Sequence, residues 1–316
     1  MKVLVTGATG FIGGALCARL NEMSDVDVIA SVRSPEQVRV PAGQVAVRDL
    51  AADTDWRELL QDVDIVVHTA AKVHEADNAD SIDEYRQTNV DGTLALARQA
   101  ASIGVKRFVF LSSVKVNGEA TRPGQAYRAD DPPAPVDAYG RSKHEAETAL
   151  QALSEEQPME VVVIRSPLVY GPGVRANFLA LMRWVSRGYP LPLASVHNAR
   201  SLVALDNLVD LVWTCCIRPE AANEIIMAAD GEDVSTAELV RRLGHALGRP
   251  ARLIACPPKL LLMLAAVAGK AEQANKLLAN LQVDIGKTRE LLDWAPVTGM
   301  EQALQATAQH FVEGQQ

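Results

Sequence analysis

Short, almost uninterrupted runs of β-branched and aliphatic residues alternate with amphipathic stretches over the first two-thirds of the chain. Such runs are typical of strands in a parallel sheet that is covered on both faces. The alternation of strand and helix predicts an α/β fold with a doubly wound parallel sheet. The expected strands cover 2–6, 27–32, 45–48, 64–68, 107–112 and 161–165, and the expected helices cover 11–23, 55–61, 81–103 and 138–154.

The pattern becomes less regular after residue 165, where a Pro- and Gly-rich turn (SPLVYGPG) follows the last of these strands. Beyond the turn we expect a helix at 176–187, a strand that leads into a helix at 203–216, short strands at 224–227 and 251–254, and further helices. We therefore predict a first domain over 1–165 and a smaller, discontinuous C-terminal lobe over 166–316. Residues 201–218 are expected to return to the first domain.

The most apolar run of the chain extends from Leu260 to Ala268. It is too short to span a bilayer, because a spanning helix needs roughly 20 apolar residues. We therefore expect no transmembrane segment. A contact with a membrane surface is one interpretation of this run, but we favour a helix that packs into the protein core.

Composition and charge narrow the classes of function. Hydrophobic residues make up 48% and charged residues 22% of the 316 positions, as in globular proteins with a real core. The net charge is −8 and only 4% of the residues are aromatic, so we expect no nucleic-acid partner. The four cysteines and six histidines lack the spacing of a metal site or a disulfide framework. With no room for a signal peptide before the first strand, we expect a metal-free protein of the reducing cytoplasm.

A glycine-rich turn lies between the first expected strand and the first expected helix, with Gly7, Gly10 and Gly13 at spacings of three. In this position Gly7 permits a tight turn and Gly10 lets the backbone approach a pyrophosphate. Gly13 lets the helix lie close to the strand, and the helix N-terminus offers amide donors. The turn therefore predicts a dinucleotide-binding domain of the Rossmann type at the N-terminus.

The ends of the next strands indicate which dinucleotide is bound. The second strand ends in Arg33 rather than in the acidic residue that would bind a ribose 2′-hydroxyl. Arg33 can pair with a 2′-phosphate, which favours NADP over NAD as the cofactor. Asp49 is positioned to bind the adenine amino group, and Ala70 and Ala71 are small enough for a cofactor to lie on the backbone.

Tyr139 and Lys143 lie four residues apart at the start of an expected helix and therefore share one face. Ser113 follows the fifth expected strand, at the edge of the sheet where substrates bind in this class of fold. We expect Tyr139 to exchange a proton with a substrate hydroxyl or carbonyl, and Ser113 to hydrogen-bond the same oxygen. Lys143 is expected to lower the pKa of the Tyr139 phenol and to reach the ribose of the cofactor.

Seven segments together resemble the extended short-chain dehydrogenase/reductases of the nucleotide-sugar epimerase/dehydratase type. They are TGATGFIG (6–13), HTAAKVH (68–74), QTNVDGT (87–93), FLSSVKVNG (110–118), YGRSK (139–143), SPLVYGPG (166–173) and RSLVALDNLVD (200–210). By this resemblance the catalytic residues are Ser113, Tyr139 and Lys143, and Pro167 lies against the nicotinamide. The remaining cofactor contacts that it implies are Gly7, Thr9, Gly10, Phe11, Ile12, Gly13, Arg33, Asp49, Leu50, Ala70, Ala71, Lys72, Asn89 and Ser112.

The resemblance also implies a UDP-sugar as the substrate, with Asn177 and Arg200 on its pyrophosphate. Two departures limit the match. The region 276–284 contains no second arginine for the pyrophosphate, and Lys276 is a poor substitute. Val114 and Lys115 occupy the positions where dehydratases carry an acidic pair, which argues against elimination of water from the sugar.

Two chemistries at C4 of the sugar remain, within bacterial polysaccharide biosynthesis. From the sequence we favour NADPH-dependent reduction of a UDP-4-keto-6-deoxy-N-acetylhexosamine, because Arg33 replaces the acidic residue. The alternative is a UDP-hexose or UDP-N-acetylhexosamine 4-epimerase with tightly bound NAD. A non-catalytic NADP-sensing regulator is less favoured, because Tyr139 and Lys143 are both retained. The resemblance further implies a homodimer formed through the helices at 81–103 and 138–154.

Overall fold

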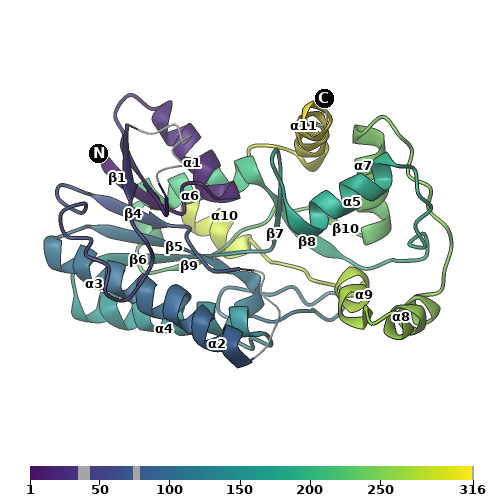
Figure 1. The fold of residues 1–316 in the computed structure, drawn as a ribbon, viewed down its shortest axis with the longest axis horizontal. Helices are drawn as coiled ribbons and strands as arrows, with labels where there is room; N and C mark the ends of the chain where they lie inside the picture. The colour runs from purple at the N-terminus through teal and green to yellow at the C-terminus, as the bar shows by residue number, and fades with distance from the viewer. Residues whose placement is uncertain (35–42, 74–78, 315–316) are drawn as a thin grey trace.

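A seven-stranded parallel sheet forms the centre of the larger domain in the computed structural model, which describes residues 1–34, 43–73 and 79–314 (Figure 1). The strand order is β3-β2-β1-β4-β5-β6-β9. The order reverses between β1 and β4, so ligands are expected where the chain leaves the carboxyl ends of these strands. The strands are β1 (Lys2–Thr6), β2 (Asp27–Val32), β3 (Gln44–Val47), β4 (Ile65–His68), β5 (Arg107–Ser113), β6 (Glu160–Ser166) and β9 (Ile225–Met227).

The first six of these strands confirm the predicted ones to within about two residues, and the expected fold class is confirmed. The strand expected at 224–227 is β9, which the sequence pattern assigns to the C-terminal lobe. It instead extends the large sheet, because Val163 and Ile164 of β6 pair in parallel with Ile225 and Ile226.

Helices cover both faces of the sheet, as its almost entirely buried strands require. On one face α1 (Phe11–Asn21), α6 (Leu205–Ile217) and α10 (Gly286–Leu292) enclose the first hydrophobic cluster. On the other face lie α2 (Ala79–Arg86), a π-helical segment (Gln87–Gly92), α3 (Thr93–Ile103) and α4 (Ala138–Glu156).

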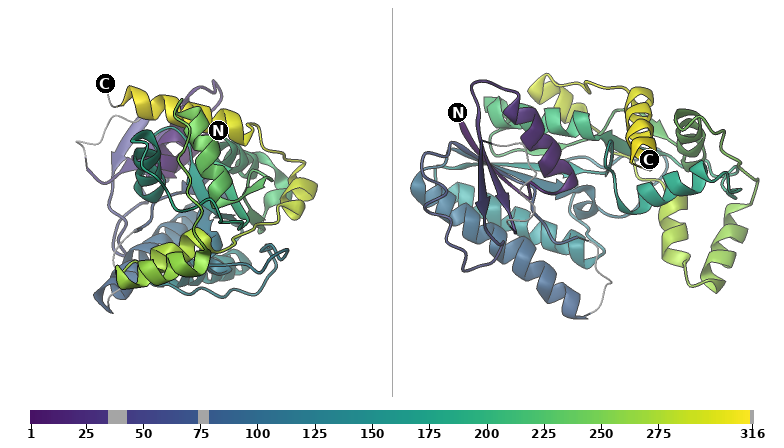
Figure 2. Two further views of the ribbon diagram at one scale, coloured as in Figure 1. Left: turned by 90° about the vertical axis from the view of Figure 1, so that its right-hand side faces the viewer. Right: turned by 45° about the horizontal axis from the view of Figure 1, so that its top comes forward.

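A smaller lobe extends from the carboxyl edge of the sheet and has its own apolar cluster (Figures 1 and 2). Its three-stranded sheet has the order β10-β8-β7. The elements of this lobe are β7 (Leu168–Tyr170), α5 (Ala176–Ser186), β8 (Arg200–Ala204), β10 (Asp233–Val234), α7 (Thr236–Ala246), α8 (Pro258–Val267), α9 (Ala271–Leu278) and α11 (Met300–Glu313).

The predictions of two short elements are wrong. The segment 55–61 forms turns instead of a helix, because the Trp56 backbone amide donates to the Gln99 side chain and Asp62 adopts a left-handed conformation (φ 60°). The segment 251–254 is not a strand, since only a single bridge joins Leu253 to Leu191.

The expected packing of the apolar run at 260–268 is also wrong. The run forms α8, and none of the ten residues of this fully described helix is buried. Hydrophobicity predicted the helix, but only its place at the edge of the small lobe decides what it faces. In the described part of the chain, no helix combines the length and the apolar character needed to cross a membrane.

Candidate active site

The glycine turn after β1 brings α1 very close to the strand that precedes it. Gly7 has a left-handed conformation (φ 71°), and its carbonyl accepts a hydrogen bond from the Gly10 amide at 2.8 Å. A Cβ added to Gly13 would lie 2.3 Å from the Gly7 carbonyl oxygen, and one added to Gly7 would lie 2.7 Å from the Ala70 nitrogen. Glycine is therefore required at both positions by close packing.

The other residues predicted on the adenosine side lie in the turn, in the first turn of α1 and after the ends of β2 and β3. Phe11 and Ile12 are half-buried against the apolar cluster beneath α1, and Thr9 lies in the turn itself. Arg33 is exposed directly after β2. The Asp49 carboxylate lies after β3, and its Oδ1 accepts the Leu50 amide at 2.8 Å.

The loop after β4 is connected to the helical layer by Asn89. The Asn89 Oδ1 accepts the Lys72 amide at 2.7 Å, and its Nδ2 donates to the Lys72 carbonyl and to Ser142 Oγ. Asn89 is buried and lies in the π-helical segment, a wider turn that often marks functional sites. These bonds hold Ala70 and Ala71 beside the glycine turn.

Tyr139 and Ser113 are brought to the same edge of the sheet by the start of α4. Asp137 caps this helix by accepting the Gly140 amide at 2.7 Å. A Cβ at Gly140 would lie 2.8 Å from the Lys115 carbonyl oxygen, so the first turn of α4 packs tightly on the turn that follows Ser113. The Ser113 Oγ accepts the Lys115 amide at 3.2 Å.

Lys143 is one turn further along α4 and almost completely buried. Its Nζ donates to the Leu111 carbonyl at 2.8 Å and lies 4.3 Å from the centroid of the Phe110 ring. Burial lowers the pKa of this ammonium to about 7, and the nearby Glu147 carboxylate opposes that shift. At neutral pH the residue therefore titrates between its charged and neutral forms.

The expected effect of Lys143 on Tyr139 is not found. Burial, followed by the negative charge of Asp137, raises the pKa of the Tyr139 phenol well above its usual value. Lys143 instead directs its ammonium to the Leu111 carbonyl. In this geometry Tyr139 is a neutral phenol and thus a proton donor.

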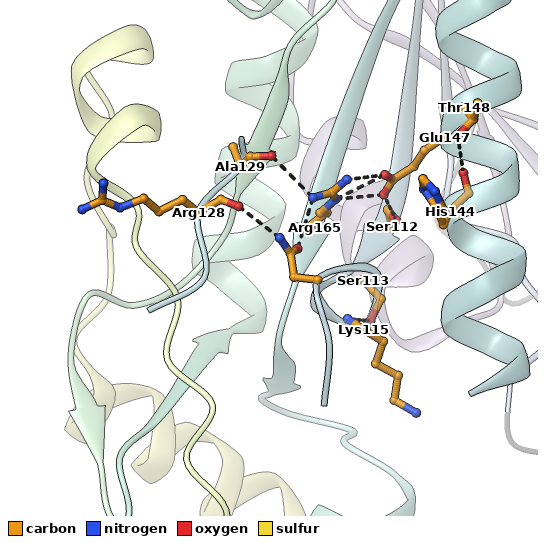
Figure 3. Close-up of polar contacts among 10 residues, drawn as sticks. Ser112, Ser113, Lys115, Arg128, Ala129, His144, Glu147, Thr148 and Arg165 are labelled. Atoms are coloured by element: carbon orange, nitrogen blue, oxygen red, sulfur yellow. Dashed lines mark hydrogen bonds and ion pairs between the residues drawn. The ribbon is translucent and has the colours of Figure 1, made fainter. Parts of the chain in front are cut away.

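A buried ionic network lies behind the catalytic edge and was missed by sequence reasoning (Figure 3). The Arg165 guanidinium on β6 contacts both carboxylate oxygens of Glu147 on α4, with Nη2 2.6 Å from Oε2. Ser112 Oγ donates to the same carboxylate, and Arg165 Nη1 donates to Asn117 Oδ1 at 3.1 Å. Two signals pointed to this network: a charge ends the apolar run VVVIR, and Glu147 follows Lys143 at helical spacing.

The hydroxyl groups of the two adjacent serines have separate partners. Ser112 Oγ bonds to the Glu147 carboxylate within the network, whereas Ser113 Oγ accepts from the turn after β5. Ser112 is buried and Ser113 is partly exposed. The Ser112 hydroxyl thus supports the buried Glu147 carboxylate, whereas Ser113 lies at the edge of the sheet near Tyr139.

A second charged group lies beside Tyr139. The Lys115 ammonium bonds to the Asp137 carboxylate and lies 5.7 Å from the centroid of the Tyr139 ring. The hydrogen bonds of Lys115 and of the Gly140 amide, with a further contribution from Lys276 on α9, lower the pKa of Asp137 against the opposing effect of burial. Lys276, which the sequence placed as a poor pyrophosphate ligand, therefore contributes positive charge near this edge.

The predicted pyrophosphate ligands of the substrate, and Pro167 from the predicted nicotinamide contacts, lie on the small lobe or at its junction with the sheet. Pro167 is buried between β6 and β7, and Asn177 is exposed in the first turn of α5. Arg200 begins β8, and its Nη1 donates to the carbonyls of Lys276 and Ala279. Burial lowers the pKa of Arg200, so the bonds to the end of α9 stabilise a partly desolvated cation.

This fold and these residues define an enzyme of the short-chain dehydrogenase/reductase type. A model of the NAD dependent epimerase/dehydratase family matches residues 3–229. The chain belongs to this family and is an NAD(P)-dependent enzyme of epimerase or reductase type, which confirms the resemblance seen in the sequence motifs.

Curated relatives extend this match to almost the whole chain. The protein is 45% identical to a UDP-glucose 4-epimerase of Vibrio cholerae, over 99% of this chain and 96% of the relative. It is 25% identical to the N-acetyl-alpha-D-glucosaminyl-diphospho-ditrans,octacis-undecaprenol 4-epimerase of Escherichia coli O157:H7, over 98% and 95% of the two chains. Activity of the nucleotide-sugar epimerase/dehydratase type is thus supported.

Solved structures show the same fold. The UDP-glucuronic acid 4-epimerase from Bacillus cereus, in complex with UDP-glucuronic acid and NAD, has a TM-score of 0.81 and 23% identity over 99% of both chains. The residues of the present chain fit a dinucleotide, because the glycine turn leads directly into α1 and its N-cap residue Gly10 is exposed.

Proposed function

We propose that this protein interconverts a UDP-hexose and its C4 epimer, with Ser113, Tyr139 and Lys143 at the reacting carbon. One structural observation carries the proposal. The tight packing of Gly140 on the Lys115 carbonyl sets Tyr139 on α4 beside the chain segment that follows Ser113 on β5. The similarity to the Vibrio cholerae UDP-glucose 4-epimerase along 99% of the chain supports the choice of epimerisation.

Each of the three side chains has a role that follows from its environment. Tyr139 exchanges the proton of the C4 oxygen, and the Ser113 hydroxyl hydrogen-bonds the same oxygen. Lys143, held between the Leu111 carbonyl and the charge of Glu147, supplies a cation whose protonation changes near neutral pH. A bound nicotinamide dinucleotide supplies the chemistry of hydride transfer, for which these side chains have no equivalent.

The cofactor is proposed to lie along the glycine turn, with its pyrophosphate at the N-terminus of α1. The glycines Gly7, Gly10 and Gly13 permit this approach, and Ala70 and Ala71 carry only small side chains beside it. Arg200 and Asn177 are proposed to bind the pyrophosphate of the substrate from the small lobe. We assign the cofactor to a first domain over 1–165, joined by 201–218, and the substrate to a lobe over 166–316.

A second candidate is the NADPH-dependent reduction of a UDP-4-keto-6-deoxy-N-acetylhexosamine. It is favoured by Arg33, which is exposed directly after β2 where a carboxylate would select NAD. Both candidates place the same residues at C4. For either one, we propose a cytoplasmic homodimer that acts in polysaccharide biosynthesis.

The two candidates differ in what happens to the hydride. We expect the purified protein to convert UDP-glucose into UDP-galactose, detected by chromatography, without net change in nicotinamide absorbance near ~340 nm. Tyr139→Phe is the matched control for both assays. Stoichiometric NADPH oxidation with the keto sugar, without epimer exchange, would establish the reductase instead. Failure of both assays with a folded, cofactor-loaded protein would reject both candidates.

A further inference from the structure

Helix α8 presents an apolar stripe to solvent. The stripe consists of Leu260, Met263, Leu264 and Val267, at the spacing that places side chains on one helix face. These side chains are 42%, 58%, 55% and 87% exposed. Single exposed apolar residues are common, whereas these four lie together on one helix face and form a continuous apolar surface. We call these four residues the α8 face.

The orientation of α8 is set by contacts of residues outside this stripe. Leu261, which lies outside the stripe, packs against the apolar cluster of the small lobe. Helices α8 and α9 pack on one another and form a hairpin at the end of the molecule far from the N-terminus (Figure 1). The α8 face is therefore held outward at the periphery of the small lobe.

The segment that carries the α8 face has only positive charges until Glu272 in α9. Residues 249–270 contain four basic and no acidic residues, in a chain whose net charge is −8. Lys259 precedes the stripe and Lys270 follows it, and both residues are exposed. An apolar stripe between cations suits an anionic bilayer, where apolar side chains enter the acyl boundary and ammonium groups meet the headgroups.

A second copy of the chain fits the α8 face less well. A helix of ten residues is about 15 Å long, and one face of it supplies less accessible surface than the ~800 Å² per partner of a stable interface. A two-fold antiparallel pairing of α8 would also bring Lys259 and Lys270 against the cations of the other copy. Like charges in such a contact oppose association.

We propose that the α8 face is a peripheral docking surface for an anionic phospholipid bilayer. Docking would hold the small lobe at the membrane, because Arg200 of β8 donates to the Lys276 and Ala279 carbonyls at the end of α9. Asn198 reinforces this connection by donating to the carbonyls of Leu277 and Ala279. The hairpin thus joins a membrane contact to the strand that bears the proposed pyrophosphate ligand.

Vesicle flotation with the full-length protein tests the proposal. We expect binding to phosphatidylcholine vesicles that contain about one-third phosphatidylglycerol, and little binding to phosphatidylcholine alone. Met263→Gln/Leu264→Gln should reduce the partition coefficient about tenfold or more, because it removes the centre of the apolar stripe. Lys259→Gln/Lys270→Gln should weaken binding and reduce its dependence on salt.

Matched substitutions elsewhere separate a specific surface from general hydrophobicity. Ile217→Gln/Val312→Gln replaces two residues of similar exposure on α6 and α11 and should leave vesicle binding unchanged. Thermal melting confirms that every variant is folded, and epimerase and ketoreductase assays without vesicles test the proposed function separately. The proposal would be overturned if the wild-type protein did not bind anionic vesicles. It would also be overturned if the α8 variant bound them as well as the wild-type protein does. If the wild-type protein is a dimer and Met263→Gln/Leu264→Gln makes it monomeric, the α8 face belongs to a second copy of the chain and the proposal is overturned.

Discussion

Arg165 and Glu147 form an ion pair whose two side chains are each 2% exposed, with Arg165 Nη2 2.6 Å from Glu147 Oε2. Arg165 belongs to β6 and Glu147 to α4, so the pair joins the sheet to the helix that carries Tyr139 and Lys143. Ser112 on the neighbouring strand bonds to the same carboxylate. The pair therefore connects β6 to the two elements, β5 and α4, that carry the proposed catalytic residues.

Removal of one partner of this pair should destabilise the protein strongly. Glu147→Leu or Arg165→Met alone leaves a buried charge without its counterion, which costs about 3–5 kcal/mol in the free energy of unfolding. The double variant removes both charges and should be less destabilised than the sum of the two single variants. Urea denaturation of all four proteins measures this, and additive effects would contradict the coupling.

Lys143 should make stability rise with pH above neutrality. Its pKa of about 7 in the folded state lies below the unfolded value of 10.5, so the unfolded chain binds more protons between these pH values. The free energy of unfolding should gain up to about 1.4 kcal/mol per pH unit from this residue across that window. Lys143→Met should remove this contribution. Denaturation curves from pH 7 to about 10 compare the two proteins, and equal slopes would contradict the assignment.

Tyr139→Phe should lower turnover without weakening the binding of the cofactor. The change removes only the hydroxyl that exchanges the proton, so turnover should fall by about 10²–10⁴-fold. Cofactor affinity, measured by fluorescence titration, should remain at the wild-type value. Ser113→Ala offers a second test of the same oxygen contact. Unchanged turnover in the Tyr139 variant would remove this residue from the mechanism.

Arg33 should influence the choice between the two dinucleotides. If its guanidinium pairs with a 2′-phosphate, Arg33→Ala should weaken NADPH binding by about 1.5–3 kcal/mol and leave NADH binding almost unchanged. Arg57→Ala, at another exposed arginine, is the matched control. Calorimetric titration of both cofactors measures the difference. Equal losses of affinity for the two cofactors would show that Arg33 does not contact the 2′-phosphate.

Local patterns predicted those parts of the protein that depend on neighbouring residues in the chain. The strand from Lys2 to Thr6, the turn at Gly7 and the shared helix face of Tyr139 and Lys143 all follow from short-range periodicity and backbone sterics. The packing of Gly13 on Gly7 belongs to the same group, since both lie in a single strand–turn–helix unit.

The remaining features depend on what the folded chain places around each side chain. Charge at Arg165 was visible in the sequence, but its pairing with Glu147 required the register of β6 and the rotation of α4. The raised pKa of Tyr139 likewise arises from burial and from Asp137, which no spacing encodes.

Helix α8 shows the same division. The amino-acid sequence by itself determined that residues 260–267 are apolar and helical, because hydrophobicity and helix propensity are local properties. Only the tertiary structure decided that Leu261 faces the small lobe while Met263 and Leu264 face solvent. The direction of an apolar face is set by which other elements reach it, and that depends on contacts between distant parts of the chain.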